Sequence, residues 1–406
     1  MKALTKISTG FLSLAAVALW FTSCSSEDVA SGTNQGNQES ILLLSFNTGN
    51  MGTRSNTDLT TDEKKINDMT IGIYSFDGQR LRTVQKLTKA DSESDATPGS
   101  KKFYFDGSGN AVAKIVTTAA LTAGDQVLVA ANTGSADFYK KGTADGFKSV
   151  DIDATTALTG ASDGAALTAA TLPKFGTSSG KLQVAGSNKS EFTASDIKLK
   201  NLVSKITLQS ISVGFADDGP YASATFEPKE MFLMSVPNKM NFSEKAWSDN
   251  PGSYLSGENK VSGENKGFLK VTLSTPSGEG ASKVLSSTNK TFTGNEKEDV
   301  LYTIPNSKTD AYKTVLVIKG TFNNNETVYY KLPLNVKYDI AKPTEAVAVA
   351  SGTQPFQIPS GKNIKCKITI NTIGSTDLDA ESGPLTATLT VTVDPWDDLT
   401  QDTTFE

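Results

Sequence analysis

Few residues of this 406-residue chain could form a catalytic site, because it contains no histidine. That absence excludes Ser-His-Asp and Cys-His nucleophile systems, zinc sites with histidine ligands and the usual general base near neutral pH. Residues 176–180 match the G-x-S-x-G pattern of serine hydrolases, with Ser178 at its centre. Ser178 stands in a Ser/Gly-rich stretch without the strand-to-helix turn that this nucleophile requires. We therefore interpret the match as a coincidence.

Two further motifs are typical of penicillin-binding enzymes, whose serine is activated without histidine. Residues 287–290 match S-x-x-K and residues 248–250 match S-D-N, but their order is inverted and no K-T-G follows. Acidic pairs such as Asp217 and Asp218 lack the spacing of a calcium loop and favour solvated turns. No pair among the 44 acidic residues is singled out for glycoside hydrolysis. The sequence predicts no enzyme, no metal site and no cofactor.

The start of the chain has the three parts of an export signal. Lys2 and Lys6 supply positive charge, residues 11–21 are apolar, and small residues precede Cys24. The apolar stretch is too short to cross a bilayer, which predicts a signal peptide over residues 1–23. Cys24 at the cleavage point is the expected acceptor of lipid, although Phe21 replaces the branched aliphatic residue that is more usual there.

Residues 41–46 form the densest apolar run outside the signal, and a polar, turn-rich stretch follows them as far as Arg54. A short β-compatible run bounded by Gly and Asn predicts a strand. Arg54 is one of only three arginines, with Arg80 and Arg82. An arginine-specific protease therefore has few places to cut, and Arg54 lies in the most flexible-looking of them. The residues alone leave open whether this is an ordinary first strand followed by a solvated arginine.

Charge and periodicity bound the fold class. The net charge is −5 and no basic cluster occurs, so the chain has no electrostatic footprint for nucleic acid. Residues 364–370 and 385–393 alternate apolar and polar side chains, which predicts half-buried strands. Strands at regular spacing with almost no helical period predict a mainly β protein with two β-sandwich domains, long loops and few short helices. We place the domains at 55–195 and 196–406, after a tether and first strand over 24–54.

Other strands are expected between these points. They are residues 69–76, 79–87, 101–105, 112–117, 125–131, 225–235, 268–273, 300–304, 314–322 and 327–336. Asp77-Gly78 predicts a hairpin turn between the first two of them. Residues 60–67 are expected to form a short helix or turn, and residues 191–199 and 201–213 a new strand pair at the start of the second domain. Cys366 is expected to be a small core residue.

Taken in order along the chain, several segments resemble the major fimbrial subunits (fimbrillins, type V pilins) of the Bacteroidales. These segments are the Cys24 lipobox, the polar-acidic residues 25–28, the apolar strand ending in Gly-Thr-Arg54, and residues 65–76, 127–134, 226–229 and 391–396. The resemblance implies two transthyretin-like β-sandwich domains. It also implies export as a lipoprotein and a cut after arginine by an extracellular protease. That cut releases the first strand, and the C-terminal segment of a neighbouring subunit fills the groove.

Carried over to this sequence, the resemblance assigns lipidation to Cys24 and cleavage to Arg54. The removable strand contains Ile41, Leu42, Leu43, Leu44 and Phe46, and the donor strand contains Trp396, Leu399, Thr403 and Phe405. The implied partners are other copies of the chain, accessory, anchor and tip subunits, the arginine-specific protease and host surface ligands. The implied locations are the outer membrane for the lipidated precursor and an extracellular fimbrium.

Alternatives remain at both ends of this interpretation. The tail is also compatible with a frayed polar terminus, or with donation that begins earlier, over residues 385–393. A tip or accessory adhesin, or a monomeric glycan-binding surface lipoprotein that keeps its first strand, would share much of the same sequence pattern.

Overall fold

The computed structural model describes most of the chain after residue 40. The described residues are 40–46, 63, 66–88, 103–105, 111–159, 172–178, 182–185, 191–194, 197, 199–215, 217–258, 266–275, 282–339, 342–380 and 387–395. They are mainly strands, with two short α-helices, α2 (Ala144–Lys148) and α3 (Ala154–Thr159), and two 3-10 turns, η5 (Pro251–Ser253) and η6 (Gly267–Leu269). None of these described helices is long and apolar enough to cross a membrane.

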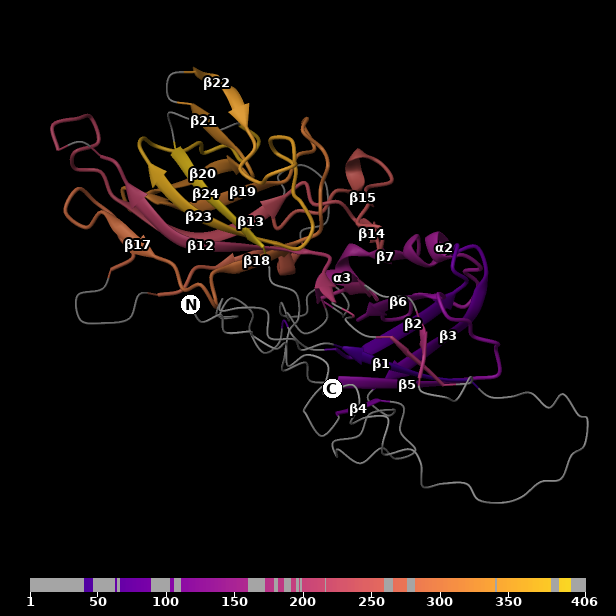
Figure 1. The fold of residues 1–406 in the computed structure, drawn as a ribbon. Coiled ribbons are helices and arrows are strands. Elements are labelled where there is room, and N and C mark those ends of the chain that lie inside the picture. The colour runs from indigo at the N-terminus through magenta and orange to yellow at the C-terminus, as the bar shows by residue number, and fades with distance from the viewer. Residues whose placement is uncertain are drawn as a thin grey trace, which may run out of the picture.

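The first half of the chain forms two five-stranded sheets, drawn in indigo and magenta in Figure 1. One has the order β4-β5-β1-β10-β9, from β4 (Phe103–Phe105), β5 (Ala111–Thr117), β1 (Ser40–Phe46), β10 (Glu191–Ala194) and β9 (Gln183–Val184). The other has the order β11-β8-β6-β2-β3, from β11 (Lys200–Asn201), β8 (Lys174–Thr177), β6 (Gln126–Ala131), β2 (Asp68–Tyr74) and β3 (Leu81–Thr88).

The second half forms two larger sheets, drawn in pink to yellow. In one, β12 (Ser204–Val213) pairs with β17 (Thr291–Thr293), β18 (Val300–Thr303) and β23 (Lys362–Ile370), and β23 also pairs with β24 (Ala387–Pro395). The other has the order β16-β13-β19-β20, from β16 (Lys270–Thr272), β13 (Phe226–Met234), β19 (Val315–Phe322) and β20 (Glu326–Pro333). A hairpin of β21 (Lys337–Asp339) and β22 (Lys342–Val347) lies beside them (Figure 1).

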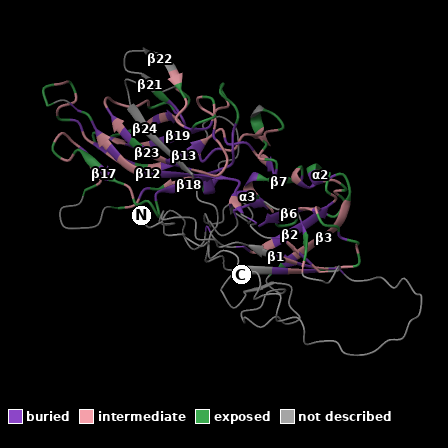
Figure 2. Cartoon of the chain, viewed as in Figure 1, coloured by how far each residue is buried: buried purple, intermediate pink, exposed green. Residues whose placement is uncertain are grey.

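A small sheet joins the two halves. β7 (Asp151–Asp153) from the first half pairs with β14 (Lys239–Asn241) from the second, and β14 also pairs with β15 (Ala246–Trp247). Buried residues of both halves belong to one apolar cluster, and Figure 2 shows the buried positions along the inner strands of each sheet. The mainly β, multi-sheet architecture confirms the predicted fold class. The domain limits 55–195 and 196–406 stay a prediction.

Alternation of side chains predicted the strands of the second half well. Ile364, Cys366, Ile368 and Ile370 lie on one buried face of β23, at 1 % exposure or less. Burial raises the pKa of the Cys366 thiol to about 12, as expected for a small core residue. The predicted Asp77-Gly78 turn joins β2 to β3, with Gly78 at a φ of 73° that favours glycine.

Several predicted elements were wrong in extent or pairing. Residues 191–199 and 201–213 do not pair with each other: β10 ends at Ala194 and pairs with β1 and β9, whereas β12 pairs with β17, β18 and β23. The expected strand over residues 268–273 begins as η6 and becomes β16 only at Lys270. Short strands such as β7 and β14 were not predicted, because two or three residues carry no readable alternation.

Candidate assembly site

β1 lies in the middle of its sheet, between one antiparallel and one parallel neighbour. All seven residues of β1 pair with β5, and residues 41–44 also pair with β10. Over residues 41–44, both backbone edges of β1 are therefore paired with a neighbouring strand. Removal of β1 would leave two unpaired strand edges facing each other across a gap one strand wide.

One face of β1 is fully buried. Leu42 and Leu44 are both 0 % exposed, whereas Ile41 and Leu43 are half-buried on the other face. The buried leucines form two cross-strand rows with their neighbours, Ile115–Leu42–Phe192 and Ala113–Leu44–Ala194. All of these neighbours are themselves buried. The alternation that predicted a strand here thus corresponds to one apolar face and one mixed face.

The contacts of β1 are of a general kind. Burying two leucine side chains contributes on the order of 3–6 kcal/mol, and β1 also pairs through its backbone with β5 and β10. Any strand with the same alternation could make contacts of both kinds by adding itself to the sheet. The site is therefore a strand position defined by its neighbours rather than by a particular sequence.

A different kind of contact lies on the other side of Arg54 in the sequence. Glu63 is 0 % exposed, and its carboxylate lies 2.9 Å from the ammonium nitrogen of Lys205 in β12. The hydroxyl of Tyr302 in β18 donates a hydrogen bond to the same carboxylate oxygen. Both partners belong to the sheet of the second half. Glu63 therefore ties the chain after Arg54 to that sheet by a buried ion pair.

Lys174 in β8 adds a second buried cation to this charge cluster. Its side chain is 0 % exposed, and its ammonium group donates a hydrogen bond to the carbonyl oxygen of Leu172 at 3.0 Å. Burial lowers the pKa of Lys174 to about 7, and the Glu63 carboxylate acts in the opposite direction. Lysines from both halves of the chain, Lys174 and Lys205, thus lie in the field of one carboxylate.

Sequence reasoning missed Glu63. It stands in a stretch of charged residues, predicted only as a short helix or turn, where nothing distinguishes it from its neighbours. Tyr302 and Lys205 are also unremarkable in their predicted strands. Glu63 and Tyr302 are 239 positions apart in the sequence. No local pattern indicates a contact over that separation.

Several predicted site residues lie outside the described part of the chain. They are Cys24, Arg54, Trp396, Leu399, Thr403 and Phe405, together with the side chain of Phe46. The structure therefore places the backbone of the predicted removable strand and the side chains of Ile41, Leu42, Leu43 and Leu44. The lipidation, cleavage and donor assignments stay predictions.

The segment that was considered as an earlier start of the donor is β24. It pairs with β23 over nine residues, from Lys362 opposite Pro395 to Ile370 opposite Ala387. Within the described residues, β24 ends the sheet path β17-β12-β23-β24. In this conformation β24 is therefore part of its own chain's second half.

Several solved structures, from Bacteroides, Parabacteroides and Porphyromonas species, have a similar fold. A protein from Bacteroides eggerthii for which cell adhesion has been proposed is similar over 90 % of this chain and 98 % of its own, with a TM-score of 0.54 and 16 % identity. A protein from Parabacteroides distasonis, also proposed to act in cell adhesion, is similar over 89 % of this chain and 99 % of its own, with a TM-score of 0.54 and 14 % identity. A fimbrilin from Porphyromonas gingivalis W83 is similar over 87 % of this chain and 97 % of its own, with a TM-score of 0.51 and 14 % identity.

These similarities confirm the fold that the resemblance to fimbrillins implied. They extend over nearly the whole of each solved chain and over 87–90 % of this one. No protein-family model and no curated protein sequence matches this chain.

Proposed function

We propose that this chain is a structural, non-enzymatic subunit of an adhesive fimbria on the cell surface. The proposal is supported by its fold, shared with a fimbrilin and with proteins for which cell adhesion has been proposed. The observation that carries it is the position of β1, an inner strand that precedes Arg54 in the sequence. One cut at Arg54 would leave β1 attached to its sheet only by non-covalent contacts.

In this proposal the precursor is anchored in the outer membrane through lipid on Cys24. An extracellular arginine-specific protease cuts after Arg54, and the cut lies between β1 and Glu63 in the sequence. β1 can then leave the gap between β5 and β10, while Glu63 keeps the new N-terminal segment attached to Lys205 and Tyr302. The mature subunit is thus released from its anchor and acquires an open strand position.

The donor is the tail of a neighbouring copy. Because β24 already pairs with β23, the residues after Pro395 are the part of the C-terminal segment left for donation. Leu399, Thr403 and Phe405 stand at alternating positions that place them on one face of a strand, with Trp396 as an anchor ahead of them. A tail that replaces β1 in the same direction runs antiparallel to β5 and parallel to β10.

The energetics favour a filled gap. An empty position exposes the apolar floor around Leu42 and Leu44 and two unpaired edges, and strand addition restores both. Replacing two buried leucines with two apolar donor side chains returns on the order of 3–6 kcal/mol. Each further apolar donor residue adds to that amount, which supports a durable polymer.

The test is controlled proteolysis of the purified full-length precursor. Treatment with an arginine-specific protease is expected to give a ladder of oligomers on an unheated gel, and Arg54→Lys is expected to abolish it. Arg80→Lys is the matched control, because Arg80 is exposed but held in the turn after β2 by hydrogen bonds with Ser75. That control is expected to polymerise normally.

A second variant tests the donor. Deleting residues 396–406 is expected to leave a chain that is cut but does not polymerise. A truncated chain that still forms the ladder would contradict the donor assignment. A full-length chain that stays monomeric after cutting would contradict the shaft role and support the tip, accessory or monomeric glycan-binding alternatives. Accessory, anchor and tip subunits and host surface ligands are the further partners that the proposal includes.

A further inference from the structure

A cavity of about 400 Å³ opens at one end of the second half, away from β1 in the sequence and in the sheet order. Its lining comes from the loop after β12, the turn between β19 and β20, and the loop after β23. The lining residues are Pro220, Tyr221, Ser223, Ala224, Phe322, Asn323, Asn325, Glu326 and Ile373. Loops at the end of a β-sandwich are a frequent position for binding sites.

The β19–β20 turn gives the cavity a defined shape. Asn323 and Asn324 have φ values of 49° and 57°, the two consecutive positive values of a type I′ hairpin turn. Asn323 is also joined to Thr225: its backbone N–H donates to the Thr225 carbonyl at 2.8 Å, and its side-chain oxygen accepts from the Thr225 N–H at 2.9 Å. The turn is therefore fastened to the start of β13.

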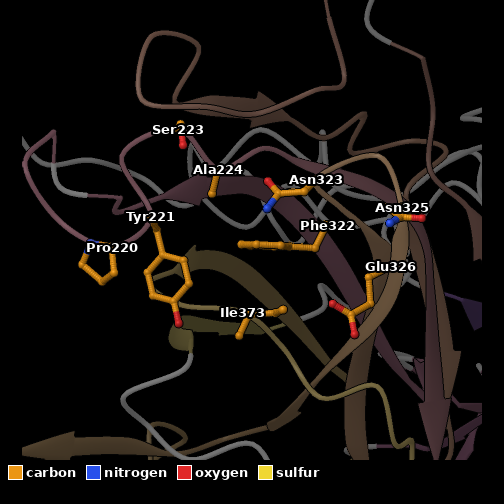
Figure 3. A pocket seen from close by; sticks show the side chains of 9 residues that line it. All are labelled: Pro220, Tyr221, Ser223, Ala224, Phe322, Asn323, Asn325, Glu326 and Ile373. Atoms are coloured by element: carbon orange, nitrogen blue, oxygen red, sulfur yellow. The ribbon is translucent and has the colours of Figure 1, made fainter.

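Two aromatic rings, Tyr221 and Phe322, line the cavity. The Tyr221 ring meets the buried Phe322 ring edge-on, with centroids 6.1 Å apart and an interplanar angle of 88°. Tyr221 and Ile373 are half-buried residues that pack on the apolar core, so each keeps some surface toward the cavity. Figure 3 shows Tyr221 and Glu326 on opposite sides of the cavity, with Phe322 and Ile373 between them.

The rim is polar and has spare hydrogen-bonding capacity. Ser223, Asn325 and Glu326 are exposed. Among the described residues, the side chains of these three make no hydrogen bond or ion pair with the protein. A hydroxyl, an amide and a carboxylate, which together donate and accept, therefore face the same cavity as the tyrosine ring.

We propose that this cavity binds a neutral sugar unit of a glycan. A sugar ring presents an apolar C–H face that packs on an aromatic ring, and hydroxyl groups that donate to a carboxylate and exchange hydrogen bonds with an amide. No lysine or arginine is among the described residues that line the cavity, which disfavours phosphate and other anionic ligands. The described lining has one carboxylate, Glu326, which is too few for a calcium site. The polar rim disfavours a purely apolar ligand.

The proposal does not depend on polymerisation. The described lining of the cavity comes from residues 220–373, whereas strand exchange concerns β1, β5 and β10. A chain that cannot exchange strands can still bind a sugar here, and a chain that polymerises can lack sugar binding. The two proposals therefore fail separately.

The test is saturation-transfer NMR on the uncut full-length protein with free sugars as probes. The probes are glucose, galactose, mannose, fucose, N-acetylglucosamine and N-acetylgalactosamine, with the anionic sugar N-acetylneuraminic acid for comparison. At least one neutral sugar is expected to give a transfer signal, and the anionic sugar none, because Glu326 repels its carboxylate. Absence of binding by every neutral sugar, or binding of the anionic sugar alone, would overturn the proposal.

Variants then locate the site. Tyr221→Ala is expected to weaken binding about tenfold through loss of the aromatic face, and Glu326→Gln to weaken it without disturbing the fold, because Glu326 is exposed. Tyr139→Ala is the control, since Tyr139 is a 60 % exposed tyrosine in the first half. Unchanged binding in both cavity variants, or an equal loss in the control, would refute the assignment.

Discussion

β1 and Glu63 stand on opposite sides of Arg54 in the sequence, and different kinds of contact hold them. β1 is held by backbone pairing with β5 and β10 and by the burial of Leu42 and Leu44. The contacts that hold Glu63 include an ion pair with Lys205 and a hydrogen bond from Tyr302. Another strand can supply the first kind of contact, whereas the second needs a carboxylate at one point in space.

This difference matches the parts that the two segments play in the proposed assembly. In that proposal, a strand of a neighbouring chain takes over the pairing and burial that β1 provides. The segment after Arg54 makes contacts that fix it to the second half of its own chain. Variants on the two sides of Arg54 are therefore expected to differ in size of effect and in whether the effect survives cleavage.

The largest effect is expected from Glu63→Ala. Removing the carboxylate takes an ion-pair partner from the buried Lys205, and breaking a buried pair in this way costs about 3–5 kcal/mol. Urea unfolding of the full-length chain should show this loss both before and after proteolysis, because Glu63 lies after the cut. Glu63→Gln can still accept the hydrogen bond from Tyr302 and should lose less. Equal stability of the alanine variant and the wild-type chain would show that the Glu63–Lys205 ion pair does not stabilise the folded chain.

Leu42→Ala should have a comparable effect, but in the uncut chain only. Truncating a fully buried leucine costs about 2–5 kcal/mol through lost burial and the cavity left behind. In the proposed polymer a donor strand replaces β1, so the variant and wild-type subunits should unfold alike. A stability loss that persists in the polymer would mean that β1 remains in its sheet after cleavage.

The charge cluster should make stability depend on pH. Burial lowers the pKa of Lys174 from its ordinary value of 10.5 to about 7 in the folded chain. The unfolded state therefore binds more protons between these values, and the free energy of unfolding should rise with pH by up to about 1.4 kcal/mol per unit. Unfolding measured from pH 6 to 10 should show this slope, and Lys174→Met should remove it.

Glu63→Gln should sharpen that result. The Glu63 carboxylate raises the pKa of Lys174, so its loss should move the start of the rise to lower pH. Leu42→Ala lies outside the cluster and should leave the slope unchanged. A slope that is the same in the wild-type and Lys174→Met chains would show that another group causes it.

The smallest effect is expected from Leu43→Thr. Leu43 is half-buried on the mixed face of β1, opposite Lys114 and Thr193. A threonine keeps β propensity there, and a loss below about 1 kcal/mol is expected for a position outside the core. A loss as large as that of Leu42→Ala in the same urea assay would mean that both faces of β1 are equally important.

Local pattern determined much of the fold. Alternation in β23 and β24 identified strands that the structure places at residues 362–370 and 387–395, and Asp77-Gly78 identified the β2–β3 hairpin. These features depend on side-chain period and turn chemistry within a few residues, which a sequence displays directly. The apolar run of β1 was visible for the same reason.

The sequence by itself therefore determined that the chain is mainly β, that histidine-based chemistry is excluded, and that an apolar strand precedes a rare arginine. Only the tertiary structure decided that β1 is an inner strand between β5 and β10, and that Glu63 meets Tyr302 across 239 residues. Strand order and buried ion pairs are contacts between segments far apart in the chain. Neither leaves a periodic trace, because each depends on which distant partner the folded chain brings near.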